Sequence, residues 1–399
     1  MATAHPAARI VDEAATGARG RPRVALVHDW LTGMRGGERC LEVACELFPD
    51  APVFTLLHVP GSVSPTIEQH RVVTSFIQRL PAAATRYRHY LPLFPAAVAR
   101  FDLRGFDLVL SLSHCVAKAA PAPRGALHLT YCFTPMRYVW DLYDDYFGER
   151  AGRLARQLMP PVAASLRRWD RRTSGVHAFV AISRHIADRI RRVYQRPAEV
   201  IYPPVDVDRF RPGGPAEDFY LVVSALVPYK RVDLAIGAAA RLGCRLVIVG
   251  TGPEAARLRA LAGPSVEFLG WRPDREVAAL YSRCRAVLFP SVEDFGIVPL
   301  EAAAAGRPTI ALARGGALET VVGPDDAGGV PATGMFFTEP TVEALAAAIE
   351  RFERAASHFD PDALRAHARQ FDRPIFARRL RAYVDAQWRA WSLNNPSSP

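Results

Sequence analysis

The sequence is poor in lysine and has no closely spaced cysteine pair. Only two of its 50 basic residues are lysines, Lys118 and Lys230. Because arginine is otherwise used throughout, a retained lysine indicates a place where a compact ammonium group is preferred. The six cysteines form no C-x-x-C motif, which argues against a zinc site or a dithiol redox site. We expect reduced thiols, no metal site and no cofactor.

Long apolar runs are also missing. No uninterrupted run approaches the ~18 residues that span a bilayer, and residues 1–22 lack the apolar centre of a signal peptide. We expect a disordered leader over 1–22, a disordered tail over 392–399 and a cytoplasmic protein. The 399 residues, half of them hydrophobic, suit two domains with separate cores.

Acidic residues are scarce in the first half. Residues 1–205 hold 27 basic and 17 acidic side chains, whereas residues 206–399 hold 23 of each. The segment 150–196 carries twelve arginines, and residues 86–104 mix arginines, aromatics and leucines. Such surfaces favour an anionic partner such as a membrane leaflet, a lipid diphosphate or nucleic acid. Solvated arginine-rich helices and an ordinary buried connector are the alternatives.

The most informative stretch is residues 286–310. An apolar strand over 286–289 leads into a loop with Gly296, and a helix is expected to begin near Pro299. Since the first amides of a helix have no internal partners, a diphosphate can dock near residues 296–298. This pattern predicts an anion site built from a strand, a loop and a helix.

Two carboxylates, Glu293 and Glu301, flank this predicted site with seven residues between them. Carboxylates repel phosphate but accept hydrogen bonds from hydroxyls, so the pair suits a ligand with hydroxyls on both sides of a diphosphate. A nucleotide sugar is such a ligand. Alternatively, Glu301 only complements the helix dipole and Glu293 is a solvated loop residue.

Other strand ends in the second half carry charge or glycine. The strand over 219–226 delivers Lys230 and Arg231 into a loop, where two cations could neutralise a leaving diphosphate. The strand over 246–249 ends at Gly250 and Gly252. This turn lacks the third glycine of a dinucleotide fingerprint, which argues against a dehydrogenase. Asp206 and Asp208 form a D-x-D sequence in a linker, which we interpret as incidental.

The first half repeats the strand–turn–helix pattern. A buried strand over 23–30 precedes a glycine loop over 33–37 and a helix over 38–47. A second strand, 106–113, ends at His114, where α/β proteins place functional groups. A plain tight turn and a buried core histidine are the competing interpretations.

These motifs together resemble retaining glycosyltransferases of the GT-B fold, including bacterial mannosyl- and rhamnosyltransferases of surface polysaccharides. The resemblance rests on Glu293-x7-Glu301 with Phe-Gly inside it, and extends over about 23–391. It implies two Rossmann-like α/β domains facing across a cleft. The expected parts are an acceptor-side domain over 23–205, a nucleotide-sugar domain over 206–373, and a helix over 374–391 that returns to the first domain.

The resemblance also implies site residues. His114, Lys230 and Glu293 are expected to be catalytic, and Arg137, Tyr138 and Trp140 to contact the acceptor. The expected donor-binding residues are Gly36, Gly37, Lys230, Arg231, Gly250, Glu293, Phe295, Gly296, Ile297 and Glu301. Two departures from the family occur: Ala225 stands where relatives carry an arginine, and Phe133 where a histidine is common. Adjacent Arg231 could replace the missing guanidinium.

The implied activity is transfer of a hexose, with mannose from GDP-mannose as the leading candidate, to a polyprenyl-diphosphate-linked glycan. The linkage would be α, no metal would be needed, and the enzyme would sit at the inner face of the cell membrane without binding nucleic acid. A UDP- or dTDP-sugar donor and a soluble acceptor are alternatives within this class. A nucleotide-sugar epimerase on the same fold and a non-catalytic basic membrane adaptor are the alternatives outside it.

Overall fold

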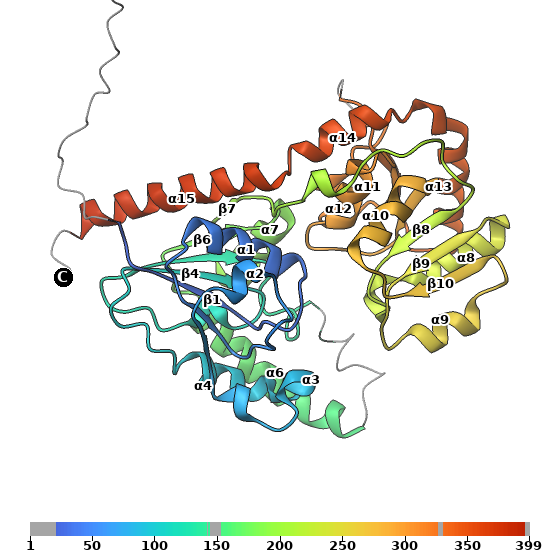
Figure 1. Cartoon of the computed structure of the whole chain (residues 1–399). Coiled ribbons are helices and arrows are strands. Elements are labelled where there is room, and N and C mark those ends of the chain that lie inside the picture. The colour runs from blue at the N-terminus through green and yellow to red at the C-terminus, as the bar shows by residue number, and fades with distance from the viewer. Residues whose placement is uncertain (1–20, 142, 144–152, 326–329, 396–399) are drawn as a thin grey trace, which may run out of the picture.

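Two parallel α/β sheets form the two halves of the molecule (Figure 1). This computed structural model describes residues 21–141, 143, 153–325 and 330–395. The predicted leader lies almost wholly outside these residues, as do Arg150 and its neighbours. Only the second half of the predicted tail does, and residues 392–394, predicted to be disordered, are helical. The prediction of two Rossmann-like domains is confirmed.

The first sheet has the strand order β3-β2-β1-β4-β5-β6-β7, with every pair parallel. Its central strands are buried on both faces because helices cover both sides. Chain order reverses between β1 and β4, so the crevice at the carboxyl ends of these two strands is the expected site. The strands are β1 (Val24–His28), β2 (Val53–Thr55), β3 (Val72–Thr74), β4 (Leu108–Ser113), β5 (Leu127–Cys132), β6 (Ala178–Ala181) and β7 (Ala198–Val200).

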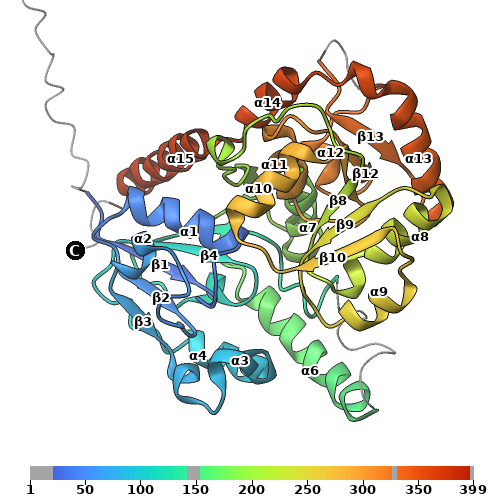
Figure 2. The same ribbon diagram turned by 45° about the vertical axis from the view of Figure 1, so that its right-hand side comes forward.

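Helices of the first domain range from single turns to the long α6, which projects along the lower side of the molecule in Figure 2. The basic-aromatic segment 86–104 forms short helical turns that contain prolines. The helices are α1 (Gly36–Leu47), α2 (Pro65–Glu68), α3 (Ala83–Arg86), α4 (Phe94–Val98), α6 (Arg153–Arg172) and α7 (Arg184–Tyr194), with 3-10 turns η1 (Phe76–Arg79), η2 (Tyr87–Leu93), η3 (Ala117–Ala119) and η4 (Val207–Arg209).

The second sheet has the order β10-β9-β8-β11-β12-β13, so its chain order reverses between β8 and β11. The strands are β8 (Tyr220–Val223), β9 (Leu246–Val249), β10 (Val266–Gly270), β11 (Ala286–Phe289), β12 (Thr309–Leu312) and β13 (Gly334–Phe337). The helices are α8 (Val232–Leu242), α9 (Ala255–Leu261), α10 (Asp274–Arg283), α11 (Ile297–Ala304), α12 (Ala317–Thr320), α13 (Val342–Ala355) and α14 (Pro361–Arg369), with turns η5 (Pro228–Lys230) and η6 (Ala356–His358).

The chain ends with the long helix α15 (Arg373–Asn394), which lies along the first domain in both Figure 1 and Figure 2. Arg373 at its start pairs with Glu42 at 2.9 Å and with Glu46 at 2.6 Å, both on α1. One face of the helix, including Phe376 and Leu380, is buried. These contacts attach the end of the chain to the first domain.

Candidate functional site

The loop between β11 and α11 carries the first predicted carboxylate. The ammonium of Lys230, at the end of η5, donates to Glu293, and the Ser291 hydroxyl donates to the same oxygen at 3.0 Å. Both charged side chains remain partly accessible, at 20% for Lys230 and 16% for Glu293. The predicted catalytic lysine and glutamate therefore lie in direct contact at a position that a ligand can reach.

The shape of this loop depends on glycine. Gly296 precedes α11 with φ +106°, a left-handed conformation that side chains disfavour. A Cβ on Gly316 would lie 2.2 Å from the Phe295 carbonyl oxygen, and the Gly316 N–H donates to Glu293 O at 2.7 Å. The 315–316 turn thus fixes the backbone that presents Glu293.

The starts of two helices, one from each domain, meet beside this loop. A Cβ on Gly36, the first residue of α1, would lie 2.8 Å from Cδ1 of Ile297, the first residue of α11. Arg39 of α1 also donates to Asp274 of α10 at 3.0 Å. Because helix N-termini carry partial positive charge and unpaired amides, two of them side by side favour an anion between them.

Glu301 lies on α11, one turn beyond the helix start. Its carboxylate accepts a hydrogen bond from the Tyr281 hydroxyl at 2.9 Å. Burial raises the pKa of Glu301, against the effects of this hydrogen bond and of the charge on Arg39. Tyr281 orients the side chain from one side, and the binding of donor hydroxyls by Glu301 stays a prediction.

Arg231 follows Lys230 but does not join the Lys230–Glu293 pair. It has a left-handed backbone with φ +49° and its guanidinium lies 3.2 Å from Asp233. Its side chain is 38% exposed. The structure therefore shows a local ion pair at this position, and substitution for the arginine absent at Ala225 stays a prediction.

Packing explains the residue type at two other predicted donor-binding positions, Gly250 and Phe295. A Cβ on Gly250 would lie 1.8 Å from the Ser224 carbonyl oxygen, so only glycine permits β9 to approach the loop after β8. The Phe295 ring is buried and stacks on Tyr202 with centroids 5.5 Å apart. These residues support the shape of the loop; direct ligand contact by either stays a prediction.

In the first domain, the centre of the site is a residue that the sequence analysis did not single out. Asp29, which follows β1, is fully buried. Its two oxygens accept four backbone hydrogen bonds, at 2.6–2.9 Å, from the turn that follows β4. The donors are the N–H groups of His114, Cys115, Val116 and Ala117. The position of an acid directly after a buried strand was the available signal.

His114 is held against this carboxylate, with Nδ1 3.1 Å from Asp29. Its ring also packs edge-on against Trp30, with centroids 4.4 Å apart. Burial lowers the pKa of His114 to about 4, although the Asp29 charge acts in the opposite direction. The imidazole is therefore neutral at physiological pH, with its Nδ1 side directed at Asp29.

A second buried pair lies beside His114. His28 Nε2 is 3.7 Å from Glu38, and neither ring nitrogen of His28 has a hydrogen-bond partner among the described residues. Burial opposes ionisation of Glu38, but its contact with His28 leaves its pKa below the ordinary value. A Cβ on Gly37 would lie 3.4 Å from the His28 ring and 3.5 Å from Phe133. Gly37, in the first turn of α1, therefore lies directly against this pair.

An ion network joins the two domains next to Glu293. Asp294 pairs with Arg137 and, at 2.7 Å, with Arg189 of α7. Burial would raise the pKa of Asp294, but these two guanidinium groups lower it on balance. Arg137, which we expected at the acceptor, thus holds the donor loop from the opposite domain.

The start of α7 makes a second connection. The N–H groups of Arg184 and His185 donate to Glu319 of the second domain at 2.8 and 2.9 Å. The Ser183 side chain caps the helix by accepting from Ile186 N–H, and it donates to the Asp294 carbonyl at 2.6 Å. A carboxylate of one domain thereby stabilises a helix N-terminus of the other.

The remaining predicted residues of the first domain take part in packing. Trp140 donates from its indole N–H to Asp170 at 2.8 Å, and Tyr138 is buried. Lys118 is also buried and lies 3.0 Å from Asp170, which is fully buried. One of the two retained lysines is therefore part of an internal ion pair, and acceptor contacts by Tyr138 and Trp140 stay predictions.

No group of three or more potential ligand side chains is placed to hold a metal ion within residues 21–141, 143, 153–325 and 330–395. In the D-x-D sequence, Asp208 lies 3.2 Å from both Arg365 and Arg369 of α14. This pairing gives Asp208 a structural role in attaching the linker to the second domain.

Sequence comparisons find a similarity to a known family in the second domain. Residues 207–370 match the family "Glycosyl transferases group 1". A D-inositol 3-phosphate glycosyltransferase of Frankia alni is 37% identical over 155 residues, covering 31% of this chain and 38% of that protein. A GDP-mannose-dependent alpha-(1-6)-phosphatidylinositol monomannoside mannosyltransferase of Mycobacterium tuberculosis is 34% identical over 195 residues, covering 41% and 50%. The chain thus spans half or less of these relatives' length.

Solved structures match over both domains. Sucrose-phosphate synthase from Thermosynechococcus elongatus has a TM-score of 0.69 at 17% identity, covering 92% of this chain and all of that chain. HepE of Anabaena, in complex with UDP and glucose, has a TM-score of 0.68 at 18% identity with the same coverage. At such identities the likeness shows the fold. Residues 207–370 of the second domain are thus similar to the glycosyl transferases group 1 family, and the fold of the chain is GT-B.

Proposed function

We propose that the protein is a retaining glycosyltransferase that moves a hexose from a nucleotide sugar to a lipid-linked glycan, forming an α-linkage. The observation that carries this proposal is the meeting of the α1 and α11 starts at Gly36 and Ile297, beside the Lys230–Glu293 pair. Two helix N-termini and an ammonium suit a diphosphate, while the carboxylate suits sugar hydroxyls. A nucleotide sugar combines both chemistries.

The proposed reaction takes place at the face of the sugar from which the diphosphate leaves. The bond between the anomeric carbon and the phosphate oxygen breaks, and a bond to the acceptor oxygen forms. The acceptor proton passes to the departing diphosphate, so no protein nucleophile is needed. Lys230 and the helix starts stabilise the charge that develops on the diphosphate, Glu293 holds sugar hydroxyls, and neutral His114 lies on the opposite domain.

The leading donor is GDP-mannose and the leading acceptor a polyprenyl-diphosphate oligosaccharide. The mannosyltransferase relative supports the donor, because its printed name specifies GDP-mannose. The basic excess of the first domain supports an acceptor attached to an anionic membrane. We propose a peripheral location at the inner face of the cell membrane; none of the described helices has the length and apolarity to cross a bilayer.

The first experiment is thermal unfolding with a panel of nucleoside diphosphates and nucleotide sugars, with and without Mg²⁺. A ligand at 100 times its Kd adds about 2.7 kcal/mol, which shifts Tm measurably. We expect the largest shift with GDP and GDP-mannose, without a requirement for Mg²⁺. The Glu293→Gln variant should retain the GDP shift and lose transferase turnover by about 10²–10³-fold.

Product analysis of the same samples separates the competing activities. Conversion of a free nucleotide sugar without an acceptor would indicate an epimerase. Near-normal turnover of Glu293→Gln would refute the assigned role of that carboxylate. If no nucleotide shifted Tm, the donor site itself would be refuted.

A further inference from the structure

A separate pocket lies at the outer edge of the first domain. It has a volume of about 830 Å³ and is formed along β3, the edge strand of the first sheet, with the segment 97–102 as its other wall. That volume is within the range of small-molecule sites, roughly 300–1,000 Å³. β3 lies two strands away from β1, and no residue of the interdomain site lines the pocket.

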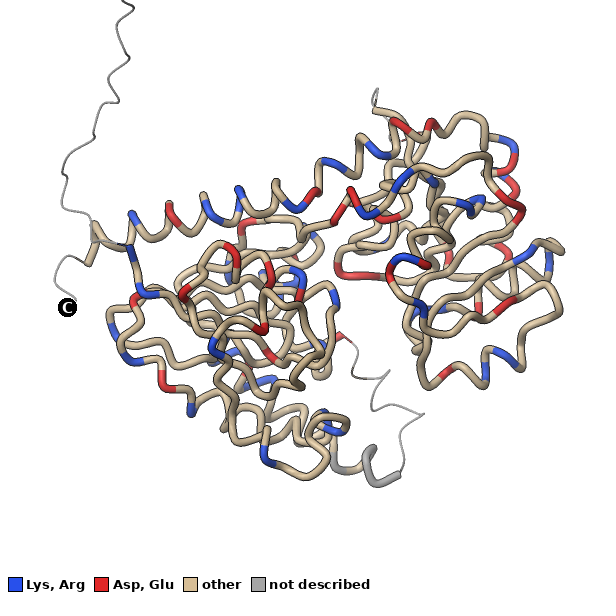
Figure 3. Tube along the Cα trace, viewed as in Figure 1, with Lys and Arg blue, Asp and Glu red and all other residues tan. Residues whose placement is uncertain are grey.

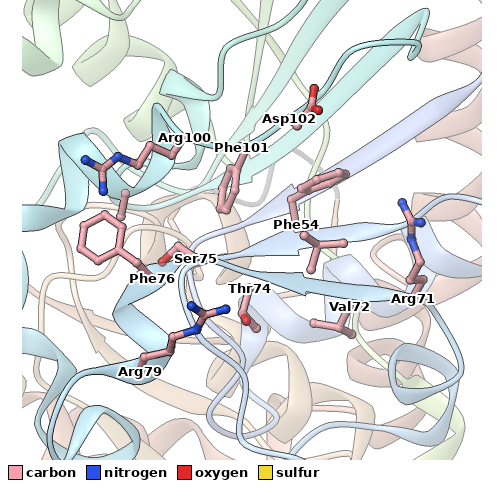
Figure 4. A pocket seen from close by; sticks show the side chains of 12 residues that line it. Phe54, Arg71, Val72, Thr74, Ser75, Phe76, Arg79, Arg100, Phe101 and Asp102 are labelled. Carbon is pink, nitrogen blue, oxygen red and sulfur yellow. The ribbon is translucent and has the colours of Figure 1, made fainter.

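Three arginines surround this pocket without a carboxylate partner. Figure 4 shows Arg71, Arg79 and Arg100 around it, with the rings of Phe54 and Phe101 between them. Among the described residues none of the three guanidinium groups forms an ion pair, and Arg100 packs over the Phe76 ring at 5.0 Å. The pocket's one acidic residue, Asp102, is already paired with Arg104 at 2.6 Å.

The side chains that line the pocket favour an anion with an apolar portion. Uncompensated guanidinium groups bind phosphate oxygens, often with two parallel hydrogen bonds. Phe54, Phe101 and Val73 supply an apolar floor next to them. A fully hydrated small anion would leave this floor unused, whereas a phosphodiester with attached hydrocarbon would cover it.

The segment that surrounds the pocket is also basic. Residues 71–104 contain six arginines and a single acidic residue, and Figure 3 shows the basic positions around α3 and α4. Within this segment Leu93 is 42% exposed. An exposed leucine in a basic segment suits the boundary between lipid headgroups and acyl chains.

We propose that this pocket binds the phosphate headgroup of an anionic membrane lipid and orients the first domain on the bilayer. The inference rests on the proposed function, because a lipid-linked acceptor requires the enzyme to work at a membrane. It goes beyond a general attraction to negative charge, since it assigns the contact to Arg71, Arg79 and Arg100.

The first test uses the native protein. Phenylglyoxal modifies accessible arginines, and the modified positions are read by peptide mass spectrometry. Vesicles of equal parts phosphatidylglycerol and phosphatidylcholine should protect Arg71, Arg79 and Arg100, while exposed Arg275 and Arg354 of the second domain remain reactive. Pure phosphatidylcholine should protect none of them. Protection by inorganic phosphate alone, or by a single-stranded oligonucleotide instead of vesicles, would overturn the lipid assignment.

The second test is co-sedimentation of variants with the same vesicles. Arg79→Gln/Arg100→Gln should weaken binding about 25-fold, at about fivefold for each arginine near an anionic surface. Arg275→Gln/Arg354→Gln makes the same change in net charge and should bind as the native protein does. Equal losses in the two double variants would overturn the pocket and leave only net charge.

Folding and donor binding are checked on the same variants. Arg79 and Arg100 are exposed and form no ion pair among the described residues, so the double variant should keep its Tm and its shift with GDP. A native protein that binds vesicles but shows no nucleotide shift would refute the proposed function and not the pocket. A nucleotide shift without vesicle binding would refute the pocket alone.

Discussion

The two domains use the same place in the fold in opposite ways. In each sheet the chain order reverses between two central strands, β1 and β4 in the first and β8 and β11 in the second. In the first domain, the amides after β4 surround a carboxylate of the chain itself, Asp29. In the second, the N–H groups of residues 296–298 after β11 have no acceptor among the described residues.

This difference explains why one domain is expected to bind the donor and the other to present fixed groups. A cluster of amides at a strand end attracts an anion wherever it occurs. When the anion is a buried side chain, the cluster becomes rigid and orients its neighbours, as Asp29 does with His114. When no internal anion is present, the cluster is available to a diphosphate.

Removing the internal anion, the Asp29 carboxylate, should have the largest effect on stability and make the first domain resemble the second. Asp29→Asn keeps the shape of the side chain but directs its NH₂ group at two backbone N–H donors. Since a buried charge network is disrupted, we expect a loss of roughly 3–5 kcal/mol in the free energy of unfolding. Urea titration followed by circular dichroism measures it.

The matched control is Asp188→Asn, which removes a carboxylate that is 61% exposed and paired with Arg191 on the surface of α7. Its expected loss is below about 1 kcal/mol. Equal stabilities of the two variants would show that the four amides do not depend on the Asp29 charge.

The second prediction concerns pH and His114. Burial lowers the pKa of this histidine to about 4 in the folded state, from an ordinary 6.5. The unfolded chain therefore takes up its proton first as the pH falls. The contribution to stability is complete above pH 6.5 and is lost as the pH falls towards 4, by at most roughly 3 kcal/mol.

His114→Gln removes this contribution, so its free energy of unfolding should fall less steeply between pH 6.5 and 4 than that of the native protein. Burial also lowers the pKa of His128, to about 3, so part of the native slope will remain. His89→Gln, at an exposed position of the first domain, controls for the loss of a histidine as such. An unchanged slope in His114→Gln would contradict the buried, neutral state of this imidazole.

The third prediction tests whether the first domain positions the donor loop. Asp294→Asn removes the charge that Arg137 and Arg189 share, directly next to Glu293. We expect kcat to fall about tenfold, which corresponds to about 1.4 kcal/mol, with a smaller change in the donor KM. Glu339→Gln, an exposed carboxylate of the second domain, should leave both constants unchanged. A purely structural role would lower Tm and leave kcat intact.

The sequence was sufficient to predict the parts of this comparison that lie within short segments. The strand over 286–289 has the predicted bounds, and Lys230 and Glu293, which follow the neighbouring strands β8 and β11, are in contact. The contacts of Asp29 with the turn after β4 and of Arg137 with Asp294 could not be predicted, because the partners lie 85 or more residues apart. Only the assembled sheets and the closed cleft bring them together. The resemblance implied an acceptor contact for Arg137; the structure adds its ion pair with Asp294 of the other domain, and the acceptor contact stays a prediction.

The smallest effect is expected where the two helix starts meet. In Gly36→Ala the new Cβ would lie 2.8 Å from Ile297 Cδ1, the flexible end of a side chain, so a small shift relieves the contact. Alanine also favours the helix over glycine by roughly 0.5–1 kcal/mol. We therefore expect unchanged or slightly higher stability, together with a rise of about threefold in the donor KM because the domains close less tightly, corresponding to ~0.7 kcal/mol.

Ile297→Val removes only the Cδ1 atom and provides the matched background for this change. If the domains close through the Gly36–Ile297 contact, Gly36→Ala should raise the donor KM of the native protein. The same substitution should have little effect on the donor KM of the Ile297→Val variant. Equal increases in both backgrounds would locate the effect within α1 instead. The double-mutant cycle therefore distinguishes a contact between the two anion-binding helix starts from a local property of the first one.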